Sequence, residues 1–147
     1  NLQLSAVQLH GDEDDHYLRT LKAALPSGCQ IWKAYRVKDT LPELTTLADR
    51  ILLDSFHPQQ HGGSGVSFDW QLLSTLNSQN IPIMLAGGLA LHNIEQALTY
   101  PVTALDLNSG LESAPGVKDP EKIQQALQLI RHFDGVFNTE KSKHSEL

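Results

Sequence analysis

Short apolar runs alternate along this chain with longer segments of helical spacing, and this alternation constrains the fold more than any other feature. The runs are β-branched or alternate with polar residues, and each is too short for a typical helix, so each is predicted to be a strand. The predicted strands are residues 6–10, 30–35, 50–53, 81–85 and 103–107. Strands separated by helices are typical of parallel βα units, so we expect an α/β domain.

Apolar residues recur every three or four positions in the intervening segments. This spacing predicts helices over residues 14–25, 69–76, 93–100 and 119–133. The last has the clearest start, because Asp119 suits the N-cap and Pro120 the first helical position. A weaker helix is predicted over 41–47, where Pro42 is tolerable only in the first turn.

The loops that follow the strands are the candidate site, because parallel sheets bind ligands beyond the carboxyl ends of their strands. Gly87 and Gly88 follow the fourth predicted strand, and Ser109 and Gly110 follow the fifth. Without a Cβ, glycine lets backbone N–H groups approach an anion, so the two pairs are predicted to hold one phosphate together. The alternative is that these glycines only end strands in tight turns.

Three ionisable residues lie at or near the ends of predicted strands. Asp54 would face the ligand side of the sheet, where a carboxyl group suits acid catalysis, but it could instead cap a loop or helix. His10 is either a substrate contact or a hydrogen-bonded histidine at the rim. Asp106 either forms a buried structural pair or faces the centre of the fold. The other histidines lack a metal-ligand spacing with Glu or Cys, so no metal site is expected.

Composition narrows the function classes. A chain of 147 residues is one domain or a piece of a larger one, and 40% hydrophobic residues suffice for a core. The net charge of −6 opposes binding to duplex nucleic acid. No apolar run reaches the roughly 18 residues of a membrane span, and no signal peptide is visible. The single cysteine, Cys29, excludes a disulfide scaffold, so a cytoplasmic location is expected.

Several short motifs in order carry a family resemblance. They read VQLHGDE (7–13), LDS (53–55), GGSG (62–65), FDW (68–70), LAGGL (85–89), NSGLE (108–112) and APGVKD (114–119). The set resembles phosphoribosylanthranilate isomerase of tryptophan biosynthesis. It is also similar to the C-terminal part of the bifunctional bacterial enzyme that fuses this isomerase behind indole-3-glycerol-phosphate synthase. The resemblance runs from about residue 6 to about residue 133.

The resemblance implies a (β/α)8 TIM barrel that performs an Amadori rearrangement of N-(5-phosphoribosyl)anthranilate with no cofactor. Asp54 matches the family's general acid, which protonates the furanose ring oxygen. The family's phosphate site matches the residues already singled out, Gly87, Gly88, Ser109 and Gly110. The loop Gly62, Gly63, Ser64 and Gly65 matches a mobile loop of the family and is a candidate lid.

The chain departs from the family pattern at its N-terminal side. Residues 6–10 match the fourth barrel strand, so this chain corresponds to strands 4 to 8 and their helices. The family's general base, a cysteine on the first strand, is therefore missing, and Cys29 does not replace it. We expect residues 1–137 to form the C-terminal portion of the barrel and residues 138–147 to form a polar, flexible tail.

Five strands without the other three leave two open edges. The expected partners are the missing N-terminal barrel segment and a fused synthase domain. Alone, the strands could repack as an open parallel sheet with a helix crossing to its other face, and the isolated chain is expected to be inactive. The alternative to an enzyme is a non-catalytic phosphosugar-binding or interaction module derived from the barrel.

Overall fold

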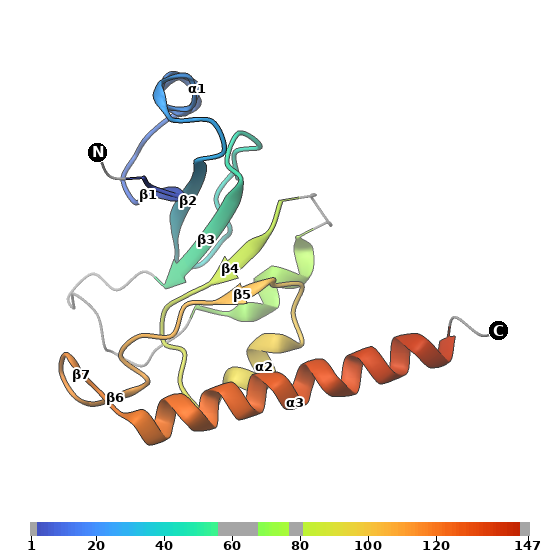
Figure 1. Ribbon diagram of the computed structural model, residues 1–147. Helices are drawn as coiled ribbons and strands as arrows, with labels where there is room; N and C mark the ends of the chain where they lie inside the picture. The colour runs from blue at the N-terminus through green and yellow to red at the C-terminus, as the bar shows by residue number, and fades with distance from the viewer. Residues whose placement is uncertain (1–2, 56–67, 77–80, 145–147) are drawn as a thin grey trace.

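Five parallel strands form one sheet in the computed structural model, which describes residues 3–55, 68–76 and 81–144 (Figure 1). The strands are β1 (Ala6–Leu9), β2 (Gln30–Val37), β3 (Arg50–Ser55), β4 (Ile83–Leu85) and β5 (Ala104–Leu105). Their order in the sheet is the same as their order in the chain. The α/β class and the parallel sheet predicted from the sequence are therefore confirmed.

The helices that follow the strands begin within one residue of the positions predicted from the sequence. They are α1 (Asp15–Ala24), the 3-10 helix η1 (Trp70–Thr75), α2 (Ile94–Leu98) and α3 (Pro120–His144). A carboxylate oxygen accepts a first-turn backbone N–H at each of three starts: Asp14 at 2.8 Å, Asp69 at 2.9 Å and Asp119 at 3.0 Å. These bonds satisfy donors that the first helical turn cannot pair internally.

The two faces of the sheet differ because strand side chains alternate. One face carries the main core, in which Ile51, Leu53 and Leu85 are buried against Leu18 of α1 and Leu73 of η1. The opposite face carries a small cluster of strand and strand-end residues, Ala34, Leu52, Met84 and Ala86. A third cluster joins α2 to α3 through Ile94, Leu111 and Ala126.

The region between β2 and β3 corrects one prediction, because residues 41–47 do not form a helix. Instead, the backbone N–H of Thr45 donates to the Tyr35 hydroxyl at 3.0 Å, and the Thr45 hydroxyl donates to Asp15 at 2.5 Å. Leu41 and Leu44 still pack against the main core. The apolar spacing therefore reflected burial, while side-chain hydrogen bonds replaced helical ones.

Other boundaries also moved. The segment after Asp69 is a short 3-10 helix, and β4 begins at Ile83, after Pro82, whose nitrogen cannot donate a ladder hydrogen bond. An unpredicted hairpin, β6 (Glu112–Ala114) with β7 (Val117–Lys118), precedes α3. The backbone of α3 continues to His144, past the end expected at residue 133, and so takes in most of the residues expected to be a tail.

The sheet is open in the part of the chain that is described. There β1 pairs with β2 and β5 with β4, and neither has a second partner. No helix residue joins the small cluster on the second face, so the crossing helix expected for a repacked sheet is not found among residues 3–55, 68–76 and 81–144. In the described part of the chain, both edge strands thus keep unpaired backbone groups.

Candidate functional site

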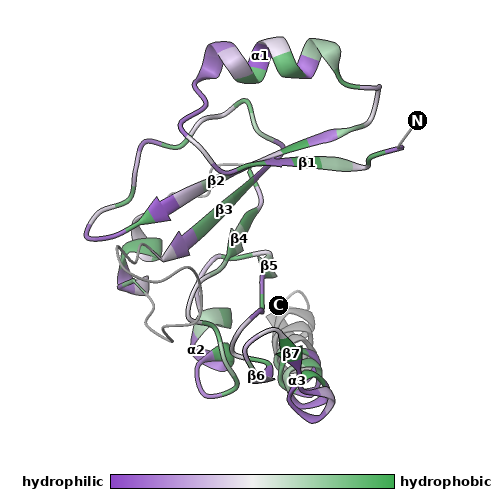
Figure 2. Cartoon of the chain, turned by 90° about the vertical axis from the view of Figure 1, so that its left-hand side faces the viewer, coloured by the Kyte–Doolittle hydropathy of each residue, from purple (hydrophilic) through white to green (hydrophobic). Residues whose placement is uncertain are grey.

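The candidate site lies where β3 and β4 end. In Figure 2 the arrowheads of β2 and β3 are hydrophilic, whereas the body of β3 is apolar. Asp54 is the residue before the end of β3 and lies in register with Arg36 of β2. By alternation, Asp54 shares the sheet face of Leu52, opposite the main core. The carboxyl group is therefore on the face whose small apolar cluster includes no helix residue among the described ones.

Gly87 lies directly against the end of β3. Its φ is +78°, a left-handed conformation that favours glycine. A Cβ at this position would come within 2.6 Å of the Ser55 backbone nitrogen and 2.7 Å of the Ser55 hydroxyl oxygen, and closer still to Oδ1 of Asp54. Conformation and space both require glycine, and the spatial requirement arises because Asp54 and Ser55 lie directly beside Gly87.

Asn93 holds the same loop from its other end. Its side-chain oxygen accepts the backbone N–H of Ala90 at 2.9 Å, and its side-chain nitrogen donates to the carbonyl of Gly88 at 3.0 Å. Asn93 is only 9% exposed, so water competes little for these bonds. The buried amide therefore fixes the path of the loop after β4.

The second glycine turn lies beside the first. Gly110 forms a parallel bridge with Ala90, and a Cβ on Gly110 would come within 2.8 Å of the Ala90 Cα. The segment just after Gly88 is thus in contact with Gly110, and Gly87 lies against Asp54. Among the described residues, the backbone N–H groups of Gly87, Gly88 and Ser109 have no hydrogen-bond acceptor.

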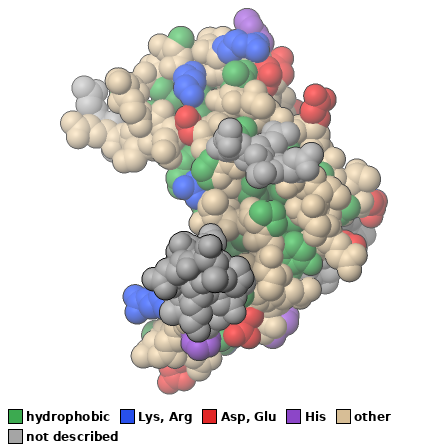
Figure 3. Space-filling view, turned by 90° about the vertical axis from the view of Figure 1, so that its right-hand side faces the viewer, with side chains coloured by type: hydrophobic (Ala, Val, Ile, Leu, Met, Phe, Trp, Pro, Cys, Tyr) green, Lys and Arg blue, Asp and Glu red, His purple; other side chains and the backbone are tan. Residues whose placement is uncertain are grey.

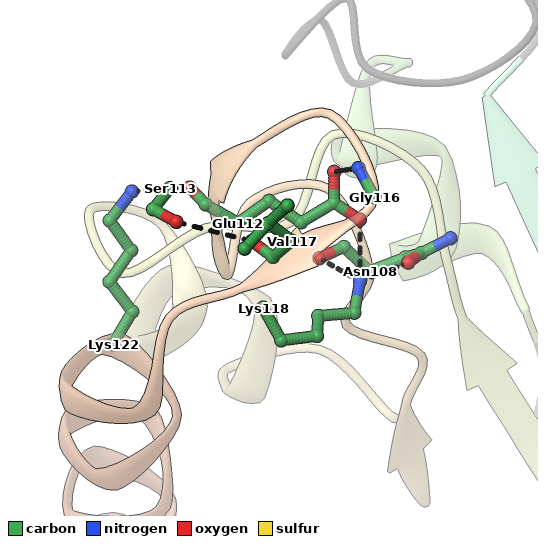
Figure 4. A network of polar contacts seen from close by, with 7 residues as sticks. All are labelled: Asn108, Glu112, Ser113, Gly116, Val117, Lys118 and Lys122. Atoms are coloured by element: carbon green, nitrogen blue, oxygen red, sulfur yellow. Dashed lines mark hydrogen bonds and ion pairs between the residues drawn. The ribbon is translucent and has the colours of Figure 1, made fainter.

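A lysine from the hairpin closes the second turn (Figure 4). The Lys118 ammonium donates to the carbonyl oxygen of Asn108 at 3.0 Å, to the side-chain oxygen of Asn108, and to Oε1 of Glu112 at 2.7 Å. Oε2 of Glu112 accepts the backbone N–H of Gly116 at 3.0 Å. The Lys118 hydrogen bond holds the pKa of the Glu112 carboxyl below its usual value.

The loop after β1 is held by an ion pair that sequence reasoning missed. Lys33 of β2 is 4% exposed in its side chain and donates to Glu13 at 2.7 Å and to the Gly11 carbonyl at 2.6 Å. That hydrogen bond from Lys33 lowers the pKa of Glu13, against the opposing effect of burial. His10, at the start of this loop, is exposed. A lysine at the centre of a mostly apolar predicted strand was the available signal for a buried partner.

The remaining candidates are placed as follows. Asp106 is exposed, and its backbone N–H donates to the Leu85 carbonyl at 2.8 Å. The candidate lid of Gly62, Gly63, Ser64 and Gly65 lies outside the described residues. Within the described ranges, no cluster of three His, Cys, Asp or Glu side chains is arranged to hold a metal ion.

The face drawn in Figure 3 is not dominated by one charge. On the face drawn in Figure 3, Lys and Arg side chains are spread out and interspersed with acidic ones. None of the described helices combines the length and the apolar content needed to cross a bilayer.

Chemically, the arrangement places a carboxyl group beside backbone donors that have no acceptor within the described ranges. Such donors on glycine-rich turns bind anionic oxygens, and the carboxyl group is available for proton transfer. The geometry therefore suits a small phosphorylated ligand whose reacting end reaches Asp54. It defines an α/β protein whose candidate anion-binding turns lie at the carboxyl edge of its parallel sheet.

Comparison with known proteins agrees with this geometry. The family described as N-(5'phosphoribosyl)anthranilate (PRA) isomerase matches residues 1–129. The tryptophan biosynthesis protein TrpCF of Vibrio cholerae is 50% identical over 133 residues, which are 90% of this chain and 28% of that protein. The chain therefore belongs to the N-(5'-phosphoribosyl)anthranilate isomerase family.

Two solved structures show the same fold. The phosphoribosyl anthranilate isomerase of Thermus thermophilus superposes with a TM-score of 0.73 at 30% identity, over 88% of this chain and 62% of that one. An isomerase in complex with reduced 1-(o-carboxyphenylamino)-1-deoxyribulose 5-phosphate superposes with a TM-score of 0.64 at 26% identity, over 88% of this chain and 61% of that one. The chain thus spans less than two thirds of each of these proteins.

Proposed function

We propose that this chain is the C-terminal portion of an enzyme that converts N-(5-phosphoribosyl)anthranilate to its aminoketose by an Amadori rearrangement in the cytoplasm. The observation that carries the proposal is the contact of Asp54 with the Gly87–Gly88 loop, which in turn touches Gly110. One proton donor and one anion cradle share an edge of the sheet. A phosphorylated aminosugar presents the two matching groups.

The proposed chemistry assigns one proton transfer to this chain. The Asp54 carboxylic acid gives its proton to the furanose ring oxygen while the C1–O bond breaks. The lone pair of the anthranilate nitrogen forms the C1=N bond, so charge and electrons balance. Loss of the proton from C2 then gives an enamine that tautomerises to the ketone. In this scheme the phosphate rests on Gly87, Gly88, Ser109 and Gly110.

The proposed architecture is a (β/α)8 barrel in which β1 to β5 are strands 4 to 8. Support comes from the open edges of β1 and β5 and from the partial coverage of the solved isomerases. The proposed partner is the N-terminal barrel segment, which would carry the base that removes the C2 proton. A fused synthase domain is a further proposed partner, because the chain covers 28% of the Vibrio cholerae TrpCF protein.

The experiment is the Asp54→Asn variant of the natural protein that carries this chain, followed by the change in anthranilate fluorescence. Removing a general acid costs about 10²- to 10⁴-fold in turnover, while phosphate binding should persist. The matched control is Asp39→Asn, which removes the same charge from an exposed surface position. Equal turnover of the two variants would contradict the role of Asp54.

The isolated 147-residue chain provides a second test. It is expected to bind inorganic phosphate but to lack turnover, because the base belongs to the missing segment. Turnover by the pure chain that Asp54→Asn abolishes would show that the chain holds a complete site. Phosphate binding without turnover in the natural protein as well would favour the non-catalytic phosphosugar-binding module.

A further inference from the structure

We infer that Lys118 is a positioning residue for the proposed phosphate cradle and does not itself grip the phosphate. The inference rests on the proposed function, because it concerns the same cradle. The evidence is that all three N–H donors of the Lys118 ammonium already have acceptors. A lysine ammonium has three N–H donors, and Lys118 directs them at two oxygens of Asn108 and one of Glu112. No donor is left for a bound anion.

The acceptors of Lys118 bracket the turn that carries Ser109 and Gly110. The carbonyl of Asn108 also accepts the backbone N–H of Leu111 at 3.1 Å, so this one oxygen closes the turn and anchors the lysine. At the other end of the turn, the backbone N–H of Glu112 donates to the Ser109 carbonyl at 3.0 Å. Lys118 therefore links Asn108 and Glu112, the residues on either side of Ser109 and Gly110.

Glu112, in β6, also links this turn to Gly116 at the turn of the hairpin and to Lys122 of α3. Its Oε2 receives the backbone N–H of Gly116, and its backbone carbonyl receives the Lys122 ammonium at 2.7 Å. Figure 4 shows these side chains converging on the hairpin from the turn and from the first turn of α3. The turn is thus fastened by charge-assisted hydrogen bonds, which are stronger than neutral ones.

Positioning and direct charge attraction predict opposite results for one substitution. If the local charge mattered most, removing the negative charge of Glu112 would free Lys118 and strengthen phosphate binding. If Lys118 acts by holding the turn, the same change weakens phosphate binding. Glu112→Gln is suitable because the amide is isosteric, yet it offers one oxygen where the carboxylate offers two.

The experiment measures competitive inhibition by inorganic phosphate, with KM and kcat, in the natural protein that carries this chain. Glu112→Gln and Lys118→Ala are each expected to raise the phosphate inhibition constant and KM by roughly three- to tenfold, with a smaller change in kcat. Lys118→Arg should restore part of the loss, because the guanidinium can reach the same oxygens. Glu121→Gln, an exposed position in the first turn of α3, is the charge control.

Each outcome decides the inference. Tighter phosphate binding by Glu112→Gln, or unchanged binding by Lys118→Ala, would overturn it while leaving the proposed function intact. Turnover by the unmodified protein without any inhibition by phosphate would refute the proposed phosphate site, and with it this role of Lys118. A variant that fails to fold is recognised by circular dichroism. The test then uses Lys118→Arg, for which KM should change more than kcat.

Discussion

Replacing Gly87 with alanine tests whether the glycine is required by its conformation, by its contact with Asp54, or by both. The backbone at φ +78° disfavours any residue with a Cβ by about 1–2 kcal/mol. The added Cβ would also lie 2.6 Å from the Ser55 nitrogen, a backbone atom held in β3. Overpacking of this kind costs a further 1–3 kcal/mol or so, giving a total loss of about 2–5 kcal/mol.

Gly28 supplies the matched control. Its φ is +85°, and a Cβ there would meet nothing within 4 Å. Gly28→Ala therefore carries the conformational cost alone, about 1–2 kcal/mol. The difference between the two variants isolates the contact with the end of β3.

The assay is urea unfolding of the unmodified protein and both variants, with turnover measured in parallel. We expect Gly87→Ala to unfold at clearly lower urea than Gly28→Ala, with an unchanged slope. Turnover should fall about 100-fold in Gly87→Ala, since a displacement near 1 Å at the reacting groups costs that much. Equal stability losses together with full turnover of Gly87→Ala would refute the reasoning.

The remaining predictions concern the contacts around the site. Lys33→Met should lower the free energy of unfolding by about 1–3 kcal/mol, because it leaves the Glu13 carboxylate and the Gly11 carbonyl without their donor. Lys22→Met removes the lysine of a more exposed ion pair and should cost about 1 kcal/mol or less. Similar losses for the two variants in urea unfolding would contradict this. Because the folded pKa of Glu13 is lowered, the ionised Glu13 stabilises the fold above the ordinary glutamate pKa of about 4.3, and this stabilisation is lost as pH falls through the folded pKa. The difference in unfolding free energy between the unmodified protein and Glu13→Gln should therefore shrink below about pH 4. A constant difference from about pH 7 to about pH 3 would oppose this. Asn93→Ala should lower the free energy of unfolding by about 1–3 kcal/mol, and by more than Asn108→Ala does, because Asn93 is buried and Asn108 is exposed. Asn93→Ala should also raise KM for the phosphorylated substrate, and an unchanged melting temperature would count against the prediction.

Most of the candidate site could be predicted from the sequence. Asp54 at the end of an apolar run, and glycines after the next two runs, identify one edge of a parallel sheet, because all parallel strands end on the same side. The contact of Gly87 with Asp54 agrees with that expectation. The motif resemblance assigned the chemistry, which no spacing rule could supply. The roles themselves remain predictions for the variants described above.

Local patterns failed where long-range contacts decided the structure. The leucines of residues 41–47 have helical spacing, yet the Tyr35 hydroxyl and Asp15 take up the Thr45 donors and the segment stays non-helical. Lys33 was passed over because its partner, Glu13, lies 20 positions away. The Lys118 contacts with Asn108 likewise depend on the β6–β7 hairpin, which was not predicted from the sequence although Pro115-Gly116 is a turn signal.

The sequence by itself determined the alternation of strands and helices, the sheet class, and the residue types that gather at its carboxyl edge, because burial periodicity and glycine placement are local properties of the chain. Only the tertiary structure decided which of these residues touch. The approach of Gly87 to Asp54, the bridge from Ala90 to Gly110, and the lysine ties of the flanking loops arise from strand register and loop packing. Those are set by the free energy of the whole fold, which no short segment contains.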